Sequence, residues 1–162
     1  MIADPGPVYP WPIGAGVRYH PAAGNADVEA GRPIGRLRCT KSGSTFAVHL
    51  ELFARRRVVI VPPHIGVGPN GCSYPIRTDE PTGVAHVQTA GRYVLGDLFR
   101  VWGRLLAPNA LLTFRGPVSV YVGGRPFRGD PRTVPLRRHA EIVVEIGGHV
   151  APHPSYLFPK GT

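Results

Sequence analysis

Residues 45–61 decide the fold, and they read TFAVHLELFARRRVVIV. From Phe46 to Phe53, large apolar side chains alternate with His49, Glu51 and other neighbours, and this period of two is typical of a β-strand. Arg55-Arg56-Arg57 separates that run from a second one, Val58–Val61, which ends at two prolines. The stretch therefore predicts a β-hairpin with an arginine-rich turn.

The segment that follows combines a loop, a short strand and a helix. Residues 64–82 are rich in Gly, Pro, Asn and Asp and predict a long loop, and residues 83–88 predict a short strand. From Leu95 to Leu106, apolar residues recur at the spacing of one helical face. Asp97 lies in the first turn of this predicted helix, as the helix dipole favours, and a proline ends it.

The C-terminal half adds a second hairpin and a last strand. Residues 118–122 alternate in polarity, Gly123-Gly124 allows a tight turn, and residues 125–128 return. Residues 141–146 alternate too and predict a half-buried strand. This order of elements predicts an α+β fold, with one helix packed on a mixed, mostly antiparallel sheet in a β-grasp-like arrangement.

Changes in composition divide the chain into three parts. Residues 1–33 contain six prolines and five glycines without sustained periodicity, which predicts an extended N-terminal arm. Residues 34–148 form the predicted single globular domain, and residues 149–162 form a proline-interrupted tail packed on it.

Six aromatic and arginine side chains are candidates for contacts with a partner. Tyr9, Trp11 and Tyr19 are aromatic residues of the arm, and leaving them in water would be unfavourable. Arg55, Arg56 and Arg57 occupy the predicted hairpin turn. We expect the arm to dock on the domain or on a partner.

Charge, hydropathy and cysteine content indicate the cellular location of the protein. The formal net charge is +9, and no stretch approaches the roughly 18 consecutive apolar residues of a membrane span. Residues 1–16 lack the basic and apolar regions of a signal peptide. Cys39 and Cys72 allow one disulfide, which indicates an oxidising compartment, two free buried thiols being the alternative. We expect a mature secreted or cell-envelope chain, with a cytoplasmic location as the alternative.

Several short motifs follow one another in a fixed order across residues 39–158. They are Val48-His49-Leu50, Pro63-His64-Ile65-Gly66-Val67, Cys72-Ser73-Tyr74, Thr82-Gly83-Val84-Ala85-His86-Val87 and Val94-Leu95-Gly96-Asp97-Leu98-Phe99-Arg100-Val101-Trp102-Gly103. They resemble an uncharacterised family of small prokaryotic extracytoplasmic domains, with the pattern His-Thr-His-Asp, Gly-Ile-Ile-His-Val, then Leu-Gly-x-Phe-Phe-x-x-Trp-Gly. The resemblance implies a fold and an extracytoplasmic location, and it implies no established activity.

The family's His-Thr-His-Asp stretch corresponds here to Arg77-Thr78-Asp79-Glu80. Imidazoles and carboxylates together suit borderline divalent metals, whereas a guanidinium repels them. The candidate is a residual metal site of His49, His86, Asp79 and Glu80. The alternative is that these are structural polar residues and that no cofactor is bound.

Other patterns predict less. His149 and His153 have H-x-x-x-H spacing, but the intervening proline disfavours a helix, so tail packing is the better interpretation. The sequence contains no nucleophile elbow, so catalysis is not predicted. The basic clusters at residues 55–57 and 137–139 have few interleaved aromatic residues, which disfavours specific nucleic-acid recognition.

These observations favour a non-catalytic extracytoplasmic binding or structural module. Its partner would be a protein, a second copy of the chain or an anionic envelope polymer. The first alternative is a metal-binding domain that uses His49 and His86 with Asp79 and Glu80. The second is a basic nucleic-acid-associated protein.

Overall fold

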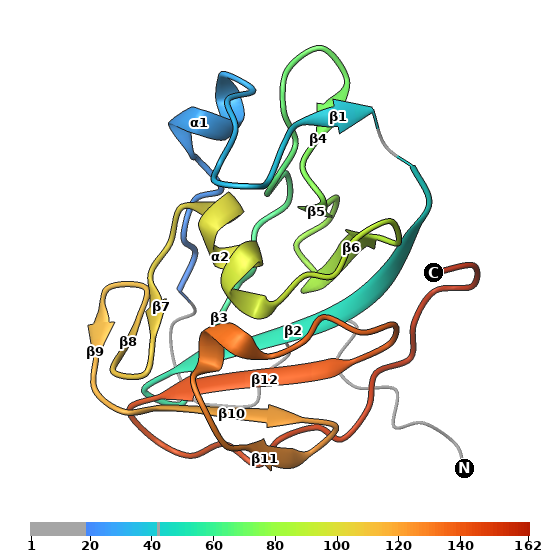
Figure 1. The fold of residues 1–162 in the computed structure, drawn as a ribbon. Coiled ribbons are helices and arrows are strands. Elements are labelled where there is room, and N and C mark those ends of the chain that lie inside the picture. The colour runs from blue at the N-terminus through green and yellow to red at the C-terminus, as the bar shows by residue number, and fades with distance from the viewer. Residues whose placement is uncertain (1–18, 42) are drawn as a thin grey trace.

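A seven-stranded sheet forms the centre of the protein in the computed structural model, which describes residues 19–41 and 43–162 (Figure 1). Along its main path the strand order is β11-β10-β12-β2-β6-β5, and β3 also pairs with β2. The strands are β2 (Thr45–Ala54), β3 (Arg57–Val59), β5 (Ile76–Thr78), β6 (Val84–Gln88), β10 (Val118–Val122), β11 (Arg125–Phe127) and β12 (Glu141–Ile146). The central pair, β12 and β2, is parallel and the other pairs are antiparallel. The predicted α+β class and mixed sheet are confirmed, and the β-grasp-like arrangement stays a prediction.

Both predicted hairpins form. The turn between β2 and β3 places Arg55 and Arg56 at φ 52° and 62°, so two consecutive residues take the left-handed conformation that suits a tight hairpin. Gly123 and Gly124 play the same part between β10 and β11, at φ 59° and 78°. Residues 64–82, predicted as loop alone, also contain the short strand β5.

The helix α2 (Leu95–Trp102) covers one face of the sheet (Figure 1). It packs Leu98, Phe99 and Trp102 against the apolar side chains of β2 and β12. The predicted helix was four residues too long. Gly103 adopts φ 73° and ends it, because a residue without a Cβ takes the left-handed conformation at little cost.

The residues that follow α2 form a separate small antiparallel sheet rather than another helical turn. Its strands are β7 (Leu106–Ala107), β8 (Ala110–Leu111) and β9 (Phe114–Arg115). The short helix η1 (Pro131–Thr133) then leads back towards β12.

The opposite face of the sheet is covered by residues 149–162, called the tail below. Its Val150 packs with Phe53 and Val143, and its Tyr156 packs with Ala47. β12, predicted to be half buried, is buried along its whole length because α2 lies on one side of the sheet and the tail on the other. Ionisable side chains of β2 and β12 that alternation would place in water are therefore enclosed.

The Cys39–Cys72 disulfide is present and confirms the predicted pairing. It links Cys39, which immediately precedes the short strand β1 (Thr40–Lys41), to Cys72 in its partner strand β4 (Cys72–Ser73), and the two Cα atoms lie 5.3 Å apart. The described part of the predicted arm contains the short helix α1 (Ala26–Glu29) and packs on the domain, since Trp102 Nε1 donates a hydrogen bond to the Ala22 carbonyl. Tyr9 and Trp11 lie outside the described residues. Among the described residues, no helix is long and apolar enough to cross a membrane.

Candidate functional site

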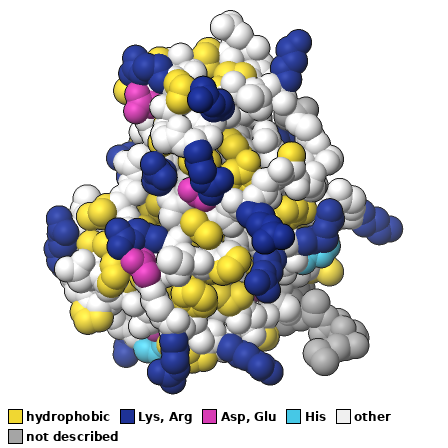
Figure 2. Space-filling view, in the orientation of Figure 1, with side chains coloured by type: hydrophobic (Ala, Val, Ile, Leu, Met, Phe, Trp, Pro, Cys, Tyr) yellow, Lys and Arg dark blue, Asp and Glu magenta, His cyan; other side chains and the backbone are white. Residues whose placement is uncertain are grey.

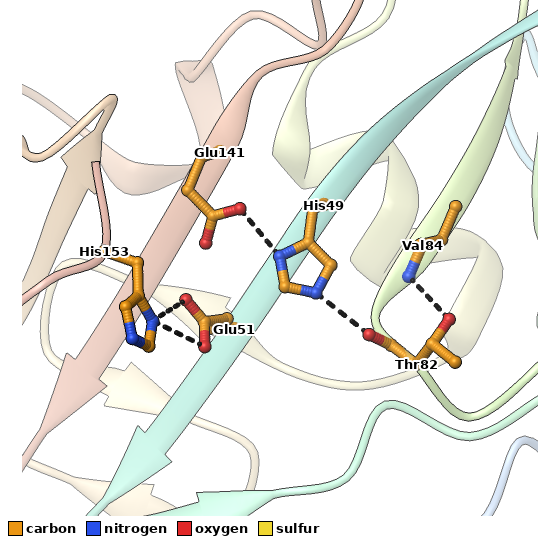
Figure 3. Close-up of polar contacts among 6 residues, drawn as sticks. All are labelled: His49, Glu51, Thr82, Val84, Glu141 and His153. Carbon is orange, nitrogen blue, oxygen red and sulfur yellow. Dashed lines mark hydrogen bonds and ion pairs between the residues drawn. The ribbon is translucent and has the colours of Figure 1, made fainter. Parts of the chain in front are cut away.

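Three ionisable side chains meet on the tail side of the central strand pair (Figure 3). His49 on β2 lies directly beside Glu141 on the parallel strand β12. Glu51 follows two residues after His49, so the pleat of the strand places it on the same face. We call these three residues the His–Glu cluster. They are 1%, 5% and 2% exposed, in the order His49, Glu51 and Glu141.

His49 is held from both ring nitrogens. Nδ1 lies 2.7 Å from Glu141 Oε2, and Nε2 donates to the Thr82 carbonyl at 2.9 Å (Figure 3). A carbonyl oxygen can only accept, so the second contact assigns a hydrogen to Nε2 and leaves Nδ1 facing the carboxyl group. The ring of Tyr156 stacks on the imidazole with centroids 3.7 Å apart. Orientation and tautomer of His49 are thus fixed.

Glu51 connects the cluster to the tail. Its carboxyl group lies near that of Glu141, since one oxygen of each falls within 4.8 Å of the other. On the other side, His153 Nδ1 lies 2.8 Å from one carboxyl oxygen and 3.1 Å from the other. Burial, then the hydrogen bond and charge of Glu141, raise the pKa of Glu51 to about 8 in spite of the nearby His153 imidazole. Burial lowers the pKa of His49 to about 4.

The cluster holds one exchangeable proton at neutral pH. Glu51 carries it, because its pKa of about 8 lies above neutral pH, and the charge of Glu141 is one cause of that rise. The His49 ring carries a hydrogen on Nε2, and its pKa of about 4 leaves it uncharged. The proton on Glu51 avoids the cost of burying two carboxylate charges side by side.

The same atoms form a group of metal-ligand type. One ligand atom from each of His49, Glu51 and Glu141 lies within 4.8 Å of the others. One imidazole and two carboxylates are donors that divalent zinc and its neighbours accept. A cavity of about 10 Å³, with His49 and Glu51 in its wall, lies between β2, β3 and residues 81–83. That is about the room that one water needs.

The predicted metal set is divided between two places. His49 belongs to the His–Glu cluster, whereas His86 Nε2 lies 3.4 Å from Asp79 Oδ2. Arg77 Nε donates to Asp79 Oδ1 at 3.1 Å, and Glu80 is exposed. Among residues 19–41 and 43–162, the set of three ligand groups within 4.8 Å contains neither His86 nor the two acidic loop residues.

The partners that sequence reasoning missed are Glu51, Glu141 and His153. Strand period alone places His49 and Glu51 on one face. The pairing of β2 with β12 and the path of the tail, however, join residues 92 and 102 positions apart in sequence. Short-range spacing carries no sign of such contacts.

The predicted partner-binding residues have mixed surroundings. Tyr19 pairs with Val59 and contacts the Phe114 ring edge-on, so it docks on the domain itself. The turn arginines at 55–57 are exposed. His149, at the start of the tail, lies 2.8 Å from the buried carboxylate of Glu145, which also accepts from the Val150 amide.

Comparisons with known proteins leave the family open. Tertiary structure supports a disulfide-bonded α+β domain with a buried His–Glu cluster, and the family resemblance described from the motifs stays a prediction. No family model, no curated protein and no solved structure matches the chain.

Proposed function

We propose that this protein is a non-catalytic, extracytoplasmic domain that binds one divalent transition-metal ion, such as zinc. The ligands would be His49, Glu51 and Glu141. The observation that carries the proposal is the convergence of these three ligand atoms within 4.8 Å on adjacent positions of β2 and β12. Three protein ligands leave a coordination position for water or for a ligand of the partner.

Charge balance supports this proposal. A divalent cation that displaces the Glu51 proton meets two carboxylates and a neutral imidazole, so the loaded site carries no net charge. His49 would bind through Nδ1 while its Nε2–H keeps the hydrogen bond to the Thr82 carbonyl. This is the outer-sphere contact that ligating histidines ordinarily make, and it orients the ring before the ion arrives.

The tail contributes to the same site. His153 orients the carboxyl group of Glu51, and Tyr156 covers the His49 ring. Glu141 also borders a groove of about 510 Å³ beneath residues 154–158, which offers a path for an ion from solvent. The tail is therefore both the cover of the site and its entrance.

The extracytoplasmic part of the proposal is supported by the disulfide. Disulfides persist in oxidising compartments, and Cys39–Cys72 closes a loop of 33 residues in the domain. The motif resemblance points to the same location. Fractionation of the native host, with the redox state of the two cysteines measured by thiol labelling, tests this part separately.

The metal site is tested by zinc titration of the full chain with isothermal calorimetry, and by elemental mass spectrometry after dialysis. We expect one zinc per chain in the wild type. Glu51→Gln and Glu141→Gln should lose it, because an amide is a poor zinc ligand and cannot exchange a proton for the ion.

Glu145→Gln is the matched control. Glu145 is a buried glutamate on β12 with a histidine partner, and it is outside the cluster. His86→Ala tests the site predicted from the sequence. Zinc retained in Glu51→Gln but lost in His86→Ala would reject the proposed ligands, and the absence of saturable zinc binding to the wild type would reject the metal function.

A further inference from the structure

A groove of about 660 Å³ on the surface is chemically unlike the His–Glu cluster. It lies between residues 91–94, which precede α2, and residues 135–138, which precede β12. Its apolar lining includes Phe46, Tyr93 and Leu136. The Leu136 amide donates to the Tyr93 carbonyl at 2.9 Å, and Val94 bridges to Pro135, so the two walls are joined by the backbone. The groove is a built feature of the fold.

Arginines surround this groove. Arg92, Arg137 and Arg138 line it, and all three are exposed. Arg36 joins them, since its guanidinium lies 5.2 Å from the centroid of the Tyr93 ring. We call the site, formed by Phe46, Arg92, Tyr93, Leu136, Arg137 and Arg138, the arginine groove.

Little negative charge balances these arginines. In the described part of the chain, Arg92 and Arg137 form no ion pair with a carboxylate. Arg138 donates a hydrogen bond to the main-chain oxygen of Thr162 at 3.0 Å. Arg36 pairs at 2.9 Å with Asp97, whose side chain is 5% exposed. Arg92 and Arg137 are therefore the two groove arginines whose charge no neighbouring carboxylate balances. Figure 2 shows the wider setting, a face on which Lys and Arg side chains far exceed Asp and Glu.

We infer that the arginine groove binds an extended acidic segment of a partner protein, in which carboxylate side chains alternate with apolar ones. The carboxylates would pair with the arginines of the rim, which offer bidentate hydrogen bonds. The apolar side chains would lie on the floor against Leu136 and the ring edges of Phe46 and Tyr93. The inference goes beyond metal binding and does not depend on it.

The arrangement of the aromatic rings favours a peptide over a nucleic acid. Binding of single strands relies on bases that stack on open aromatic faces. Here a guanidinium already lies over each ring, Arg36 over Tyr93 at 5.2 Å and Arg138 over Phe46 at 5.8 Å. One face of each ring is therefore covered by an arginine that already donates to an oxygen, Arg36 to Asp97 and Arg138 to Thr162. The ring edges are left for aliphatic side chains, and Arg92 and Arg137 are left for the carboxylates of the peptide.

The test uses the full chain in EDTA, so that its result is independent of any metal. The probe is a fluorescein-labelled decapeptide of alternating glutamate and leucine, followed by fluorescence anisotropy. Arg92→Gln/Arg137→Gln removes two groove charges. The matched control, Arg56→Gln/Arg57→Gln, removes two charges at the exposed turn between β2 and β3. We expect the groove variant to weaken binding about tenfold and the control less than about twofold.

Two further probes complete the test. A decapeptide of alternating glutamate and serine keeps the charge and lacks the apolar side chains, and we expect it to bind at least about fivefold more weakly. An oligothymidylate of equal charge tests the nucleic-acid alternative. Equal losses in the two double variants, equal affinity for the two peptides, tighter binding of the oligonucleotide, or no peptide binding up to about 1 mM would each overturn the inference.

Discussion

Replacing Glu51 by glutamine should remove most of the dependence of stability on pH between about pH 6.5 and about pH 8. The Glu51 pKa is about 8 in the folded protein and 4.5 ordinarily, because the side chain is buried beside Glu141. Between these values the folded state holds one proton more than the unfolded chain. The free energy of unfolding therefore falls as pH rises, by roughly 1.4 kcal/mol per pH unit. This contribution is fully present below pH 4.5 and is lost as pH passes 8.

His49 acts in the opposite direction over a lower range. Its pKa falls from 6.5 to about 4 on burial, so the folded state holds one proton fewer between those values and stability rises with pH. The two slopes cancel between about pH 4.5 and about pH 6.5. Of these two groups, Glu51 alone titrates from about pH 6.5 to about pH 8, and over these 1.5 units its contribution to the wild-type stability should fall by roughly 2 kcal/mol.

The assay is urea-induced unfolding in EDTA at both ends of this upper range, followed by intrinsic fluorescence. Wild type and the matched control Glu145→Gln should show the loss of roughly 2 kcal/mol, and Glu51→Gln should be flat to within the error of the extrapolation. A slope in Glu51→Gln as steep as in the wild type would refute the assignment of the cluster's proton to Glu51. Saturating zinc should abolish the wild-type slope, because neither the zinc-bound folded state nor the unfolded chain then holds a proton on Glu51.

Three further outcomes follow from the tail, the disulfide and the end of α2. His153→Ala should lower zinc affinity about tenfold in calorimetry while the far-ultraviolet circular dichroism stays unchanged, since it orients a ligand and is not one. Cys39→Ser/Cys72→Ser should lower the free energy of unfolding by about 3–4 kcal/mol in denaturant titrations, given the 33-residue separation. Gly103→Ala should lower it by about 1 kcal/mol in the same measurement, because alanine resists φ 73°.

The sequence predicted those elements whose signals are local. The β2–β3 hairpin was correct because the arginine turn lies between two apolar runs, and the start of α2 at Leu95 was correct because the apolar spacing begins there. The end of α2 was wrong. The apolar spacing continues through Leu105 and Leu106, and the ability of Gly103 to end a helix outweighed it.

The candidate site was only half visible in the sequence for the same reason. His49 was chosen as a candidate ligand. Its neighbour Glu141 lies on β12, which pairs with β2 in parallel, and a parallel pairing has no hairpin turn that would mark it in the sequence. Period-two alternation predicted that β12 is half buried. The prediction was wrong because the tail covers the second face of the strand, and alternation carries no sign of that cover. Long-range pairing, rather than local propensity, assembled the site.

The cost of burying the His–Glu cluster is itself an argument for a ligand. Apolar side chains flank it on the same face, with Ala47 and Phe53 on β2 and Val143 on β12. A further apolar residue at position 51 would extend this packing, and replacing buried ionisable groups in this way is often neutral or stabilising. A buried carboxyl pair that holds a proton up to about pH 8 contributes less to folding than such packing would. What it adds is a displaceable proton beside an oriented imidazole, and this arrangement favours a divalent ion.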